Sequence, residues 1–254
     1  MPEAYLYALI LSLAVFSALW PISVLIRDVS IVDAWWGPGV FGAALLIFMI
    51  SGSGGDHAWL MLAIVGVWAG RLGFILLRRR LRHGAEDNRY VMIRASWGPS
   101  FWWKSYFIVF FLQGFLQWVV VFPAMASIAV GPASFGALAW IGLAVALAGF
   151  ALEAKADAEL DAFKKTAGEG DLLQTGLRRF MRHPNYTGEM IFWWGVWLIA
   201  VDAGAWWTFF GPLTLTVLLT KVSGAGITGG HLKQSKPAFR EYAARTPAFV
   251  PKFG

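Results

Sequence analysis

The segment Arg182–Glu189 gathers six polar or ionisable side chains directly before the apolar run Met190–Ala200. Its proline suits the first turn of a helix, where free main-chain N–H groups attract anions or amide oxygens. Asn185 and Glu189 are four residues apart, so a helix places them on one face. A carboxylate one turn inside hydrocarbon needs a partner. We therefore expect this segment to bind a ligand, or to close the bundle by pairing Glu189 with the preceding basic residues.

A second polar group lies at the end of a long apolar run. As a helix, this stretch puts Glu153, Asp157 and Asp161 in one row and Lys164 close beneath them. Acidic residues early in the helix and basic residues late in it also suit the helix dipole. Two interpretations stay open: a ligand-binding face, or a solvated helix that leaves the membrane.

A third group opens another apolar run and includes a carboxylate that we expect inside the bilayer. Asp33 is followed by Trp35 and Trp36, two indoles that can stack on a flat apolar ligand or anchor the helix at the interface. Gln113 and Gln117, four residues apart in a later run, add polar groups to the interior and can bind substrate or join helices.

Two further segments have open interpretations. The segment Glu86–Tyr90, which contains Asp87, lies in the most basic loop and can bind a sugar or an amide, or simply form a turn. The tail, residues 231–254, interleaves aromatic and basic residues. It can lie on the membrane surface or fold back as a lid over the basic face.

Composition predicts the elements that must position these groups. Of the 254 residues, 58% are hydrophobic and 14% are charged, whereas soluble domains carry roughly 25% charged residues. The chain is therefore expected to be an all-α polytopic membrane protein with one domain. A spanning helix needs about 20 apolar residues. Seven runs qualify: Ala4–Ile26, Ile31–Ile50, Ala58–Leu77, Phe101–Ile128, Phe135–Leu152, Tyr186–Val201 and Trp206–Val222.

Charge predicts how these helices are oriented. Lys and Arg gather after the third run, between the fifth and sixth runs, and after the seventh, while the alternate loops contain neither residue. By the positive-inside rule, the N-terminus lies outside and the C-terminus in the cytoplasm. The net charge of +6 then reflects topology and anionic headgroups, or a phosphate-bearing ligand, and no nucleic-acid binding is expected.

The chain lacks the residues or motifs that several kinds of functional site require. The chain has no cysteine, so it forms no disulfide and offers no thiolate nucleophile or ligand. No Walker loop, HExxH motif or GxGxxG strand–helix unit occurs, and no metal site is predicted.

The polar segments together resemble the steroid 5α-reductase C-terminal-domain family. The resemblance rests on Arg182–Glu189 and on Phe239–Phe253 near the C-terminus. Asp28–Gly37 and Glu86–Tyr90 resemble a bacterial branch of that family. The Arg-His-Pro-x-Tyr-x-Gly element is also shared with isoprenylcysteine carboxyl methyltransferases. The resemblance covers essentially the whole chain, with residues 1–100 as the substrate side and 101–254 as the cofactor-binding half.

The resemblance implies a seven-helix reductase that uses NADPH from the cytoplasm and takes a steroid or another lipophilic enone from the bilayer. Arg residues suit pyrophosphate and 2′-phosphate. The cofactor contacts that it implies are Asp157, Lys164, Arg179, Arg182, His183, Asn185, Tyr186, Glu189, His231, Tyr242, Arg71, Arg78, Arg94 and Asp87. Substrate contacts are expected at Trp35, Trp36, Gln113 and Gln117.

This chain departs from the family pattern at the residues that bind the substrate carbonyl. The steroid reductases use a Gln-Glu pair on the second helix and a tyrosine on the third. Here the nearest carboxylate is Asp33, and the closest phenol along the chain is Tyr90. We therefore predict a protonated Asp33 as the acid at the substrate carbonyl and Tyr90 as its helper, in a site that excludes water.

Three functions remain open from the sequence. The first is NADPH-dependent reduction of the C4–C5 double bond of 3-oxo-Δ4 steroids or a related enone. The second is methyl transfer from S-adenosylmethionine to a lipophilic acceptor. The third is non-catalytic binding or transport of a sterol or lipid. We expect a monomer in the bacterial cytoplasmic membrane or an equivalent membrane, surrounded by lipid, with the cofactor site facing the cytoplasm.

Overall fold

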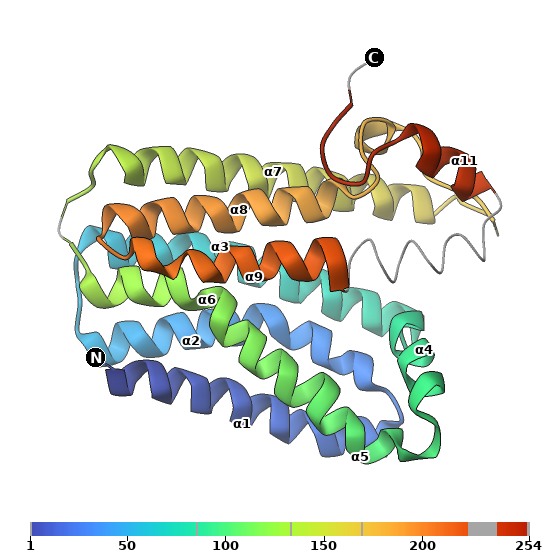
Figure 1. Ribbon diagram of the computed structural model, residues 1–254, viewed down its shortest axis with the longest axis horizontal. Coiled ribbons are helices and arrows are strands. Elements are labelled where there is room, and N and C mark those ends of the chain that lie inside the picture. Colours follow the sequence, from blue (N-terminus) through green and yellow to red (C-terminus); the bar gives the residue numbers. More distant parts are fainter. Residues whose placement is uncertain (1, 85, 133, 169, 223–237, 253–254) are drawn as a thin grey trace. The chain divides into compact units, whose positions relative to one another are not determined.

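A computed structural model describes residues 2–84, 86–132, 134–168, 170–222 and 238–252 (Figure 1), and in these ranges the chain is helical and contains no strand. The main helices are α1 (Pro2–Ile26), α2 (Trp36–Ser51), α3 (Asp56–His83), α4 (Asn88–Trp97), α5 (Phe101–Ser105), α6 (Leu112–Val130), α7 (Ala137–Lys164), α8 (Pro184–Asp202), α9 (Phe210–Val217) and α11 (Ala238–Arg245). A 3-10 helix, η1 (Val29–Trp35), leads into α2.

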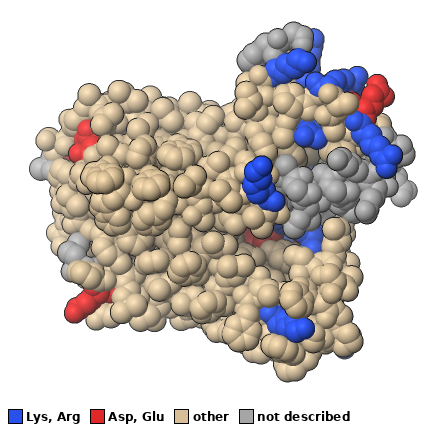
Figure 2. All heavy atoms as spheres, viewed as in Figure 1, with Lys and Arg blue, Asp and Glu red and all other residues tan. Residues whose placement is uncertain are grey.

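Five helical segments are long and apolar enough to cross a membrane: Pro2–Ile26, Val29–Ser51, Asp56–Arg82, Asn88–Val130 and Ala137–Lys164. Such segments predominate in membrane proteins because helices satisfy their own main-chain hydrogen bonds in lipid. Figure 2 shows that residues other than Lys, Arg, Asp and Glu cover most of the visible face. The chain therefore has the character of a membrane protein.

Two predicted runs are not single α-helices. The run at Phe101–Ile128 consists of α5, a π-helical turn at Tyr106–Phe111, and α6. The run at Trp206–Val222 consists of a 3-10 turn, α9, and a π-helical turn at Leu218–Val222. A π-turn rotates the residues after it relative to a regular helix, which hydropathy alone does not reveal.

The chain divides into two compact units. The first comprises Met1–Ala139 and Ile199–Gly211, and the second comprises Trp140–Leu198 and Pro212–Gly254. The division therefore lies at a different point from residue 100, where the predicted substrate side ends, and α8 contributes to both units.

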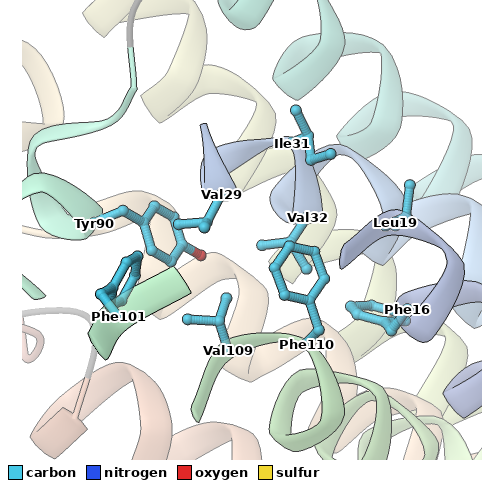
Figure 3. Close-up of a cluster of buried hydrophobic side chains, with 9 residues drawn as sticks. All are labelled: Phe16, Leu19, Val29, Ile31, Val32, Tyr90, Phe101, Val109 and Phe110. Carbon is cyan, nitrogen blue, oxygen red and sulfur yellow. The ribbon is translucent and has the colours of Figure 1, made fainter. Parts of the chain in front are cut away.

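In the first unit, α2 packs against α1, α3 and α6. Gly37 permits the close approach of α2 to α3, because a Cβ at this position would collide with the main-chain oxygen of Ala69. A buried apolar cluster joins α1, η1, α4, α5 and the π-turn (Figure 3). It consists of Phe16, Leu19, Val29, Ile31, Val32, Tyr90, Phe101, Val109 and Phe110. Tyr90 belongs to this cluster through its ring, so the cluster fixes the position of its hydroxyl.

A buried histidine ties together three connections of the first unit. The His57 ring has no exposed surface, and its Nε2 lies 2.9 Å from Asp202 Oδ2, while its Nδ1 lies 3.3 Å from the Pro132 oxygen. Asp202 also accepts a hydrogen bond from the Gly136 N–H at 2.8 Å. His57 and Asp202 therefore hold together the start of α3, the end of α8 and the connection that follows α6.

In the second unit, α7 and α8 lie side by side (Figure 1). Glycines line their contact. A Cβ at Gly149, Gly188 or Gly195 would collide with the main chain of the opposing helix. Small residues allow helix backbones to approach closely, which is a common way of packing helices in membranes. This packing fixes the first turns of α8, where the polar segment lies, against the charged end of α7.

Candidate functional site

The strongest candidate site in the first unit is a hydrogen-bonded network around Asp33. Tyr90 donates its hydroxyl hydrogen to Asp33 Oδ1 at 2.6 Å, and Arg89 Nη2 donates to Asp33 Oδ2 at 2.7 Å. Each carboxylate oxygen therefore has one donor. Tyr90 is buried, whereas the side chains of Asp33 and Arg89 are 20% and 29% exposed. The structure thus joins Asp33 and Tyr90, the two residues predicted to act on a carbonyl, and leaves one side of the network accessible.

Two side chains predicted to bind substrate extend this network into the helices. Gln113 Nε2 donates to the Tyr90 oxygen at 3.0 Å, and the Trp36 indole donates to Gln113 Oε1 at 2.7 Å. Gln117 is buried and donates to the main-chain oxygens of Trp35 and Trp36, at 3.2 and 3.0 Å. These bonds stabilise the junction between η1 and α2.

The two neighbouring indoles face different surroundings. The Trp36 indole belongs to the network, whereas Trp35 is 42% exposed and lines an apolar groove of about 750 Å³. The groove runs between α2 and α3 and includes Phe41, Gly70 and Phe74 among its lining residues. The predicted platform of two indoles stacked on one ligand is therefore divided between two faces of α2.

Helix caps place Asp33 and Tyr90 opposite each other. Asp28 caps η1 by accepting from the Ser30 N–H at 2.8 Å, and it forms an ion pair with Arg80. Burial raises the pKa of Asp28, but the hydrogen bonds from Ser30 and Arg80 outweigh burial and lower it. Because Asp28 is held in this way, the following turn of η1 projects Asp33 from a fixed position.

The cap of α4 comes from Asp87, a residue predicted to contact the cofactor. Asp87 Oδ1 accepts from the Arg89 N–H at 2.9 Å and from Arg89 Nε at 3.0 Å. Burial raises the pKa of Asp87, but its bonds to Arg89 lower it overall. Arg89 therefore lies between two carboxylates, Asp33 and Asp87. The sequence interpretation did not identify Arg89 as a partner of Asp33, although a carboxylate expected in hydrocarbon required a nearby cation.

Arg94, another predicted cofactor contact, is engaged within the first unit. Its guanidinium forms an ion pair with Glu86 at 2.7 Å and lies 4.7 Å from the centre of the Phe101 ring. Glu86 also accepts from the Val29 N–H at 2.9 Å, which links α4 to η1. The structure thus gives Arg94 a packing role. The other two predicted arginines of this unit, Arg71 and Arg78, lie on α3.

In the second unit, the described part of the tail folds back over the polar segment. The N–H groups of Arg182 and His183 donate to the oxygens of Pro247 and Ala248, at 2.9 and 3.0 Å. Thr187 Oγ1 donates to the Phe249 oxygen at 3.0 Å. Of the two predicted arrangements of the tail, residues 238–252 adopt the one that returns to the basic segment, while His231 lies outside the described residues.

His183 is held by aromatic rings. Its ring stacks on Tyr186 with centroids 5.4 Å apart and lies 5.7 Å from the ring of Phe249. Burial, together with the charges of Arg182 and Arg178, lowers the pKa of His183 to about 4. His183 is therefore neutral at pH 7 and fits a packing role in the segment.

Three arginines, Arg178, Arg179 and Arg182, lie in or just before this segment. Tyr242 donates its hydroxyl hydrogen to the main-chain oxygen of Arg178 at 2.6 Å. Burial raises the pKa of Tyr242. Burial also lowers the pKa of Arg178. Arg182 lies over the Phe239 ring, and its buried Nε has no hydrogen-bond partner among the described residues. Arg179 is exposed. The segment thus offers cationic groups with spare hydrogen-bonding capacity.

The remaining predicted cofactor residues lie on α7 and α8 of the same unit. Asn185 is in the first turn of α8, and Glu189 follows one turn later. Asp157 and Lys164 lie in the last part of α7, where Glu159 accepts from the Leu177 N–H at 2.9 Å. These side chains and the three arginines therefore come from one unit, whereas Arg71, Arg78, Asp87 and Arg94 come from the other.

Comparison with known proteins gives a family but no activity. Residues 19–246 match the sequence model of a family described as "Protein of unknown function (DUF1295)". An uncharacterized protein of Schizosaccharomyces pombe is 28% identical over an alignment 280 residues long, which covers 98% of this chain and 80% of the yeast protein. No solved structure matches the chain. Because the match covers most of the sequence, the chain belongs to the DUF1295 family.

Proposed function

We propose that this protein is a membrane-embedded reductase, related to the steroid 5α-reductases, that uses NADPH to reduce the C4–C5 double bond of 3-oxo-Δ4 steroids or a related lipophilic enone. The observation that carries the proposal is the 2.6 Å hydrogen bond between Tyr90 and Asp33, with Arg89 on the second carboxylate oxygen. Reduction of an enone needs a hydrogen-bond donor at its carbonyl oxygen, and this network holds such a donor beside apolar side chains.

The directions of the hydrogen bonds refine the roles of the two residues. Asp33 accepts from both Tyr90 and Arg89, so the hydrogen in the pair belongs to Tyr90. We therefore assign Tyr90 as the donor to the carbonyl, and Asp33 as the group that orients the Tyr90 hydroxyl. From the sequence, Asp33 was predicted as the acid and Tyr90 as its helper, so this assignment exchanges their roles. Reduction places a hydride on the β-carbon, and negative charge develops on the carbonyl oxygen, where the Tyr90 hydroxyl stabilises it. A proton, ultimately from solvent, then adds to the α-carbon and gives the saturated ketone.

Cofactor binding is assigned to the second unit. When bound, NADPH supplies the hydride. Arg179 and Arg182 suit its phosphates, and the Nε of Arg182, which is buried and has no hydrogen-bond partner among the described residues, is a donor of the kind that an anionic group satisfies. Asn185 lies at the start of α8, where free N–H groups and the helix dipole favour negative charge. The residues present thus fit a dinucleotide with several phosphate oxygens.

The orientation of the protein follows from the same proposal. Seven membrane-spanning helices, with the N-terminus outside and the C-terminus in the cytoplasm, would give the basic segments access to cytoplasmic NADPH. The substrate would enter from the bilayer, since a steroid or comparable enone partitions into lipid. A monomer contains all the residues that the proposal uses.

The first experiment measures thermal stabilisation of the detergent-purified protein by NADPH, NADH and S-adenosylmethionine. A ligand at about 100 times its dissociation constant stabilises the folded state by about 2.7 kcal/mol. We expect stabilisation by NADPH that is lost in Glu189→Ala and kept in Glu241→Ala, a change at an exposed carboxylate of α11. A response to S-adenosylmethionine alone would contradict the reductase proposal and favour methyl transfer.

The second experiment measures turnover. The purified protein is mixed with NADPH and a 3-oxo-Δ4 steroid, and the absorbance of NADPH is followed while the product is identified by mass spectrometry. We expect a product heavier by two hydrogens. NADPH binding without consumption across a panel of enones would leave a nucleotide-binding protein and contradict the proposed reaction.

A further inference from the structure

The hydrogen bonds that reach Tyr90 form a chain whose direction is fixed at its far end. An indole nitrogen can only donate, so the atom of Gln113 that lies 2.7 Å from the Trp36 indole must be the amide oxygen. The amide nitrogen of Gln113 is therefore the atom that faces Tyr90, at 3.0 Å. Because this nitrogen also can only donate, the Tyr90 oxygen must accept.

The single hydroxyl hydrogen of Tyr90 is consequently directed to its other neighbour. That neighbour is Asp33 Oδ1 at 2.6 Å. The other oxygen of Asp33, Oδ2, is paired with Arg89, and an ionised carboxylate can only accept. The chain therefore runs from Trp36 through Gln113 and Tyr90 to Asp33 in one direction. Rotating the Gln113 amide by 180° would place its nitrogen against the indole N–H, with two donors facing each other.

We infer that Trp36 and Gln113 are positioning residues that hold the Tyr90 hydroxyl as a hydrogen donor on the Asp33 side. This inference rests on the proposed function for its catalytic meaning. A ligand carbonyl would take the place of Asp33 as the acceptor of the Tyr90 hydrogen. As that hydrogen moves toward the carbonyl oxygen, the Gln113 N–H stabilises the charge left on the Tyr90 oxygen.

A further residue supports the start of this chain. Gln117 donates to the main-chain oxygens of Trp35 and Trp36, at the turn from which the Trp36 indole projects. Gly39 leaves room for this contact, since a Cβ there would collide with the Gln117 amide. Three of the four side chains predicted to touch substrate thus act on the position of Tyr90, while Trp35 lines the groove.

The test uses the full-length protein in detergent, with ¹³C at the ring Cζ of its six tyrosines. The Tyr90 signal is identified by its absence in Tyr90→Phe. We expect Trp36→Phe and Gln113→Leu each to move the Tyr90 signal, because the bond to its oxygen is lost or reversed. Trp118→Phe is the matched control: it removes another indole hydrogen bond of the first unit, to the main-chain oxygen of Tyr5 at 2.9 Å, and should leave the Tyr90 signal in place. An unmoved Tyr90 signal in both Trp36→Phe and Gln113→Leu would overturn the inference.

Kinetics supply the second readout. With NADPH and a 3-oxo-Δ4 steroid, Trp36→Phe and Gln113→Leu should lower kcat about tenfold with KM nearly unchanged, as expected for one lost hydrogen bond in the transition state. Gln113→Glu keeps the shape of the side chain but presents an oxygen to Tyr90, so it should lower kcat further than Gln113→Leu. Wild-type kcat in Gln113→Glu would overturn the inference. If the wild type reduces no enone, the reductase proposal fails, and the tyrosine signals still decide the positioning role.

Discussion

The two candidate regions are held together by different kinds of bond. In the first unit, Asp33, Arg89, Tyr90 and Gln113 are joined almost entirely through side chains. In the second unit, the segment at Arg182–Glu189 is held by main-chain hydrogen bonds to the tail and by stacked rings. A side-chain network depends on the identity of each member, whereas main-chain pairing tolerates many sequences. This difference fits our proposal, in which the first region carries the chemistry and the second binds the cofactor.

The largest effect is expected in the side-chain network. Tyr90→Phe removes the hydrogen that the proposal delivers to the carbonyl, so kcat should fall by about 100- to 1,000-fold. Stabilisation by NADPH should remain, because the change lies in the first unit and the cofactor residues proposed to bind phosphate lie in the second. Steady-state kinetics and thermal shifts measure the two effects. Tyr7→Phe, at a half-exposed tyrosine of α1, is the control, and full turnover in Tyr90→Phe would remove Tyr90 from the mechanism.

Acid should destabilise the second region before the first. The pKa of folded His183 is about 4, below its ordinary value of 6.5, because burial and the charges of Arg182 and Arg178 disfavour the protonated ring. Between these pH values the unfolded chain binds more protons, so the free energy of unfolding falls as pH drops from about 7 to 4. The total loss is about 3 kcal/mol. Thermal midpoints measured across this range should show the decline.

The control for this acid effect is His183→Phe, which should flatten the decline between pH 7 and 4. Asp28 and Asp87 contribute in a different range. Their pKa values lie below the ordinary 3.8, so their stabilisation is lost only as pH falls through these lowered values. An unchanged decline in His183→Phe would show that another group causes it.

Two arginines predicted to bind phosphate should behave differently. Arg179 is exposed in the second unit, whereas Arg94 is paired with Glu86 in the first. Arg179→Gln should weaken NADPH binding about tenfold through loss of one charged hydrogen bond, and Arg94→Gln should leave affinity unchanged. Titration of the thermal shift with NADPH gives both affinities. A larger loss of affinity in Arg94→Gln than in Arg179→Gln would reverse the assignment of the two units.

The smallest effect concerns one bond between the polar segment and the tail. Thr187→Val removes the donor to the Phe249 oxygen and keeps the side-chain shape. The free energy of unfolding should fall by about 1 kcal/mol, since a single neutral hydrogen bond is lost and main-chain pairing continues. Thermal unfolding in detergent measures this loss. Thr214→Val on α9 provides a similar threonine change elsewhere in the unit, and an equal effect there would show that Thr187 is not special.

The sequence predicted the long helices well because hydropathy and length are sufficient for that purpose. The runs at Ala4–Ile26, Ile31–Ile50 and Ala58–Leu77 correspond to α1, α2 with part of η1, and α3. The π-turns within two later runs were missed, since the same apolar residues fit both helix types. The helix α4 was also missed: Glu86–Tyr90 was interpreted as a loop segment, but its last residues begin a helix capped by Asp87.

The sequence predicted which residues belong to the candidate site better than it predicted which hydrogen bonds join them. Asp33 and Gln113 were identified as polar groups in apolar runs, Trp36 as an indole near Asp33, and Tyr90 through the family resemblance. The structure brings these four together. Which partner each one takes depends on helix rotation and cap geometry, which residue spacing within one helix does not determine. For this reason Arg89 was missed as the cation beside Asp33.

The pairing of the tail with the polar segment also has a consequence for biosynthesis. The N–H groups of Arg182 and His183 find their acceptors at residues 247 and 248. At about 5–20 residues per second, the ribosome adds these acceptors roughly 3–13 s after the segment itself. During that interval α8 can already lie in the membrane while its entrance is unfinished. A chain that stops before residue 247 would keep these donors unpaired, so we expect proteases to cut truncated chains first at this segment.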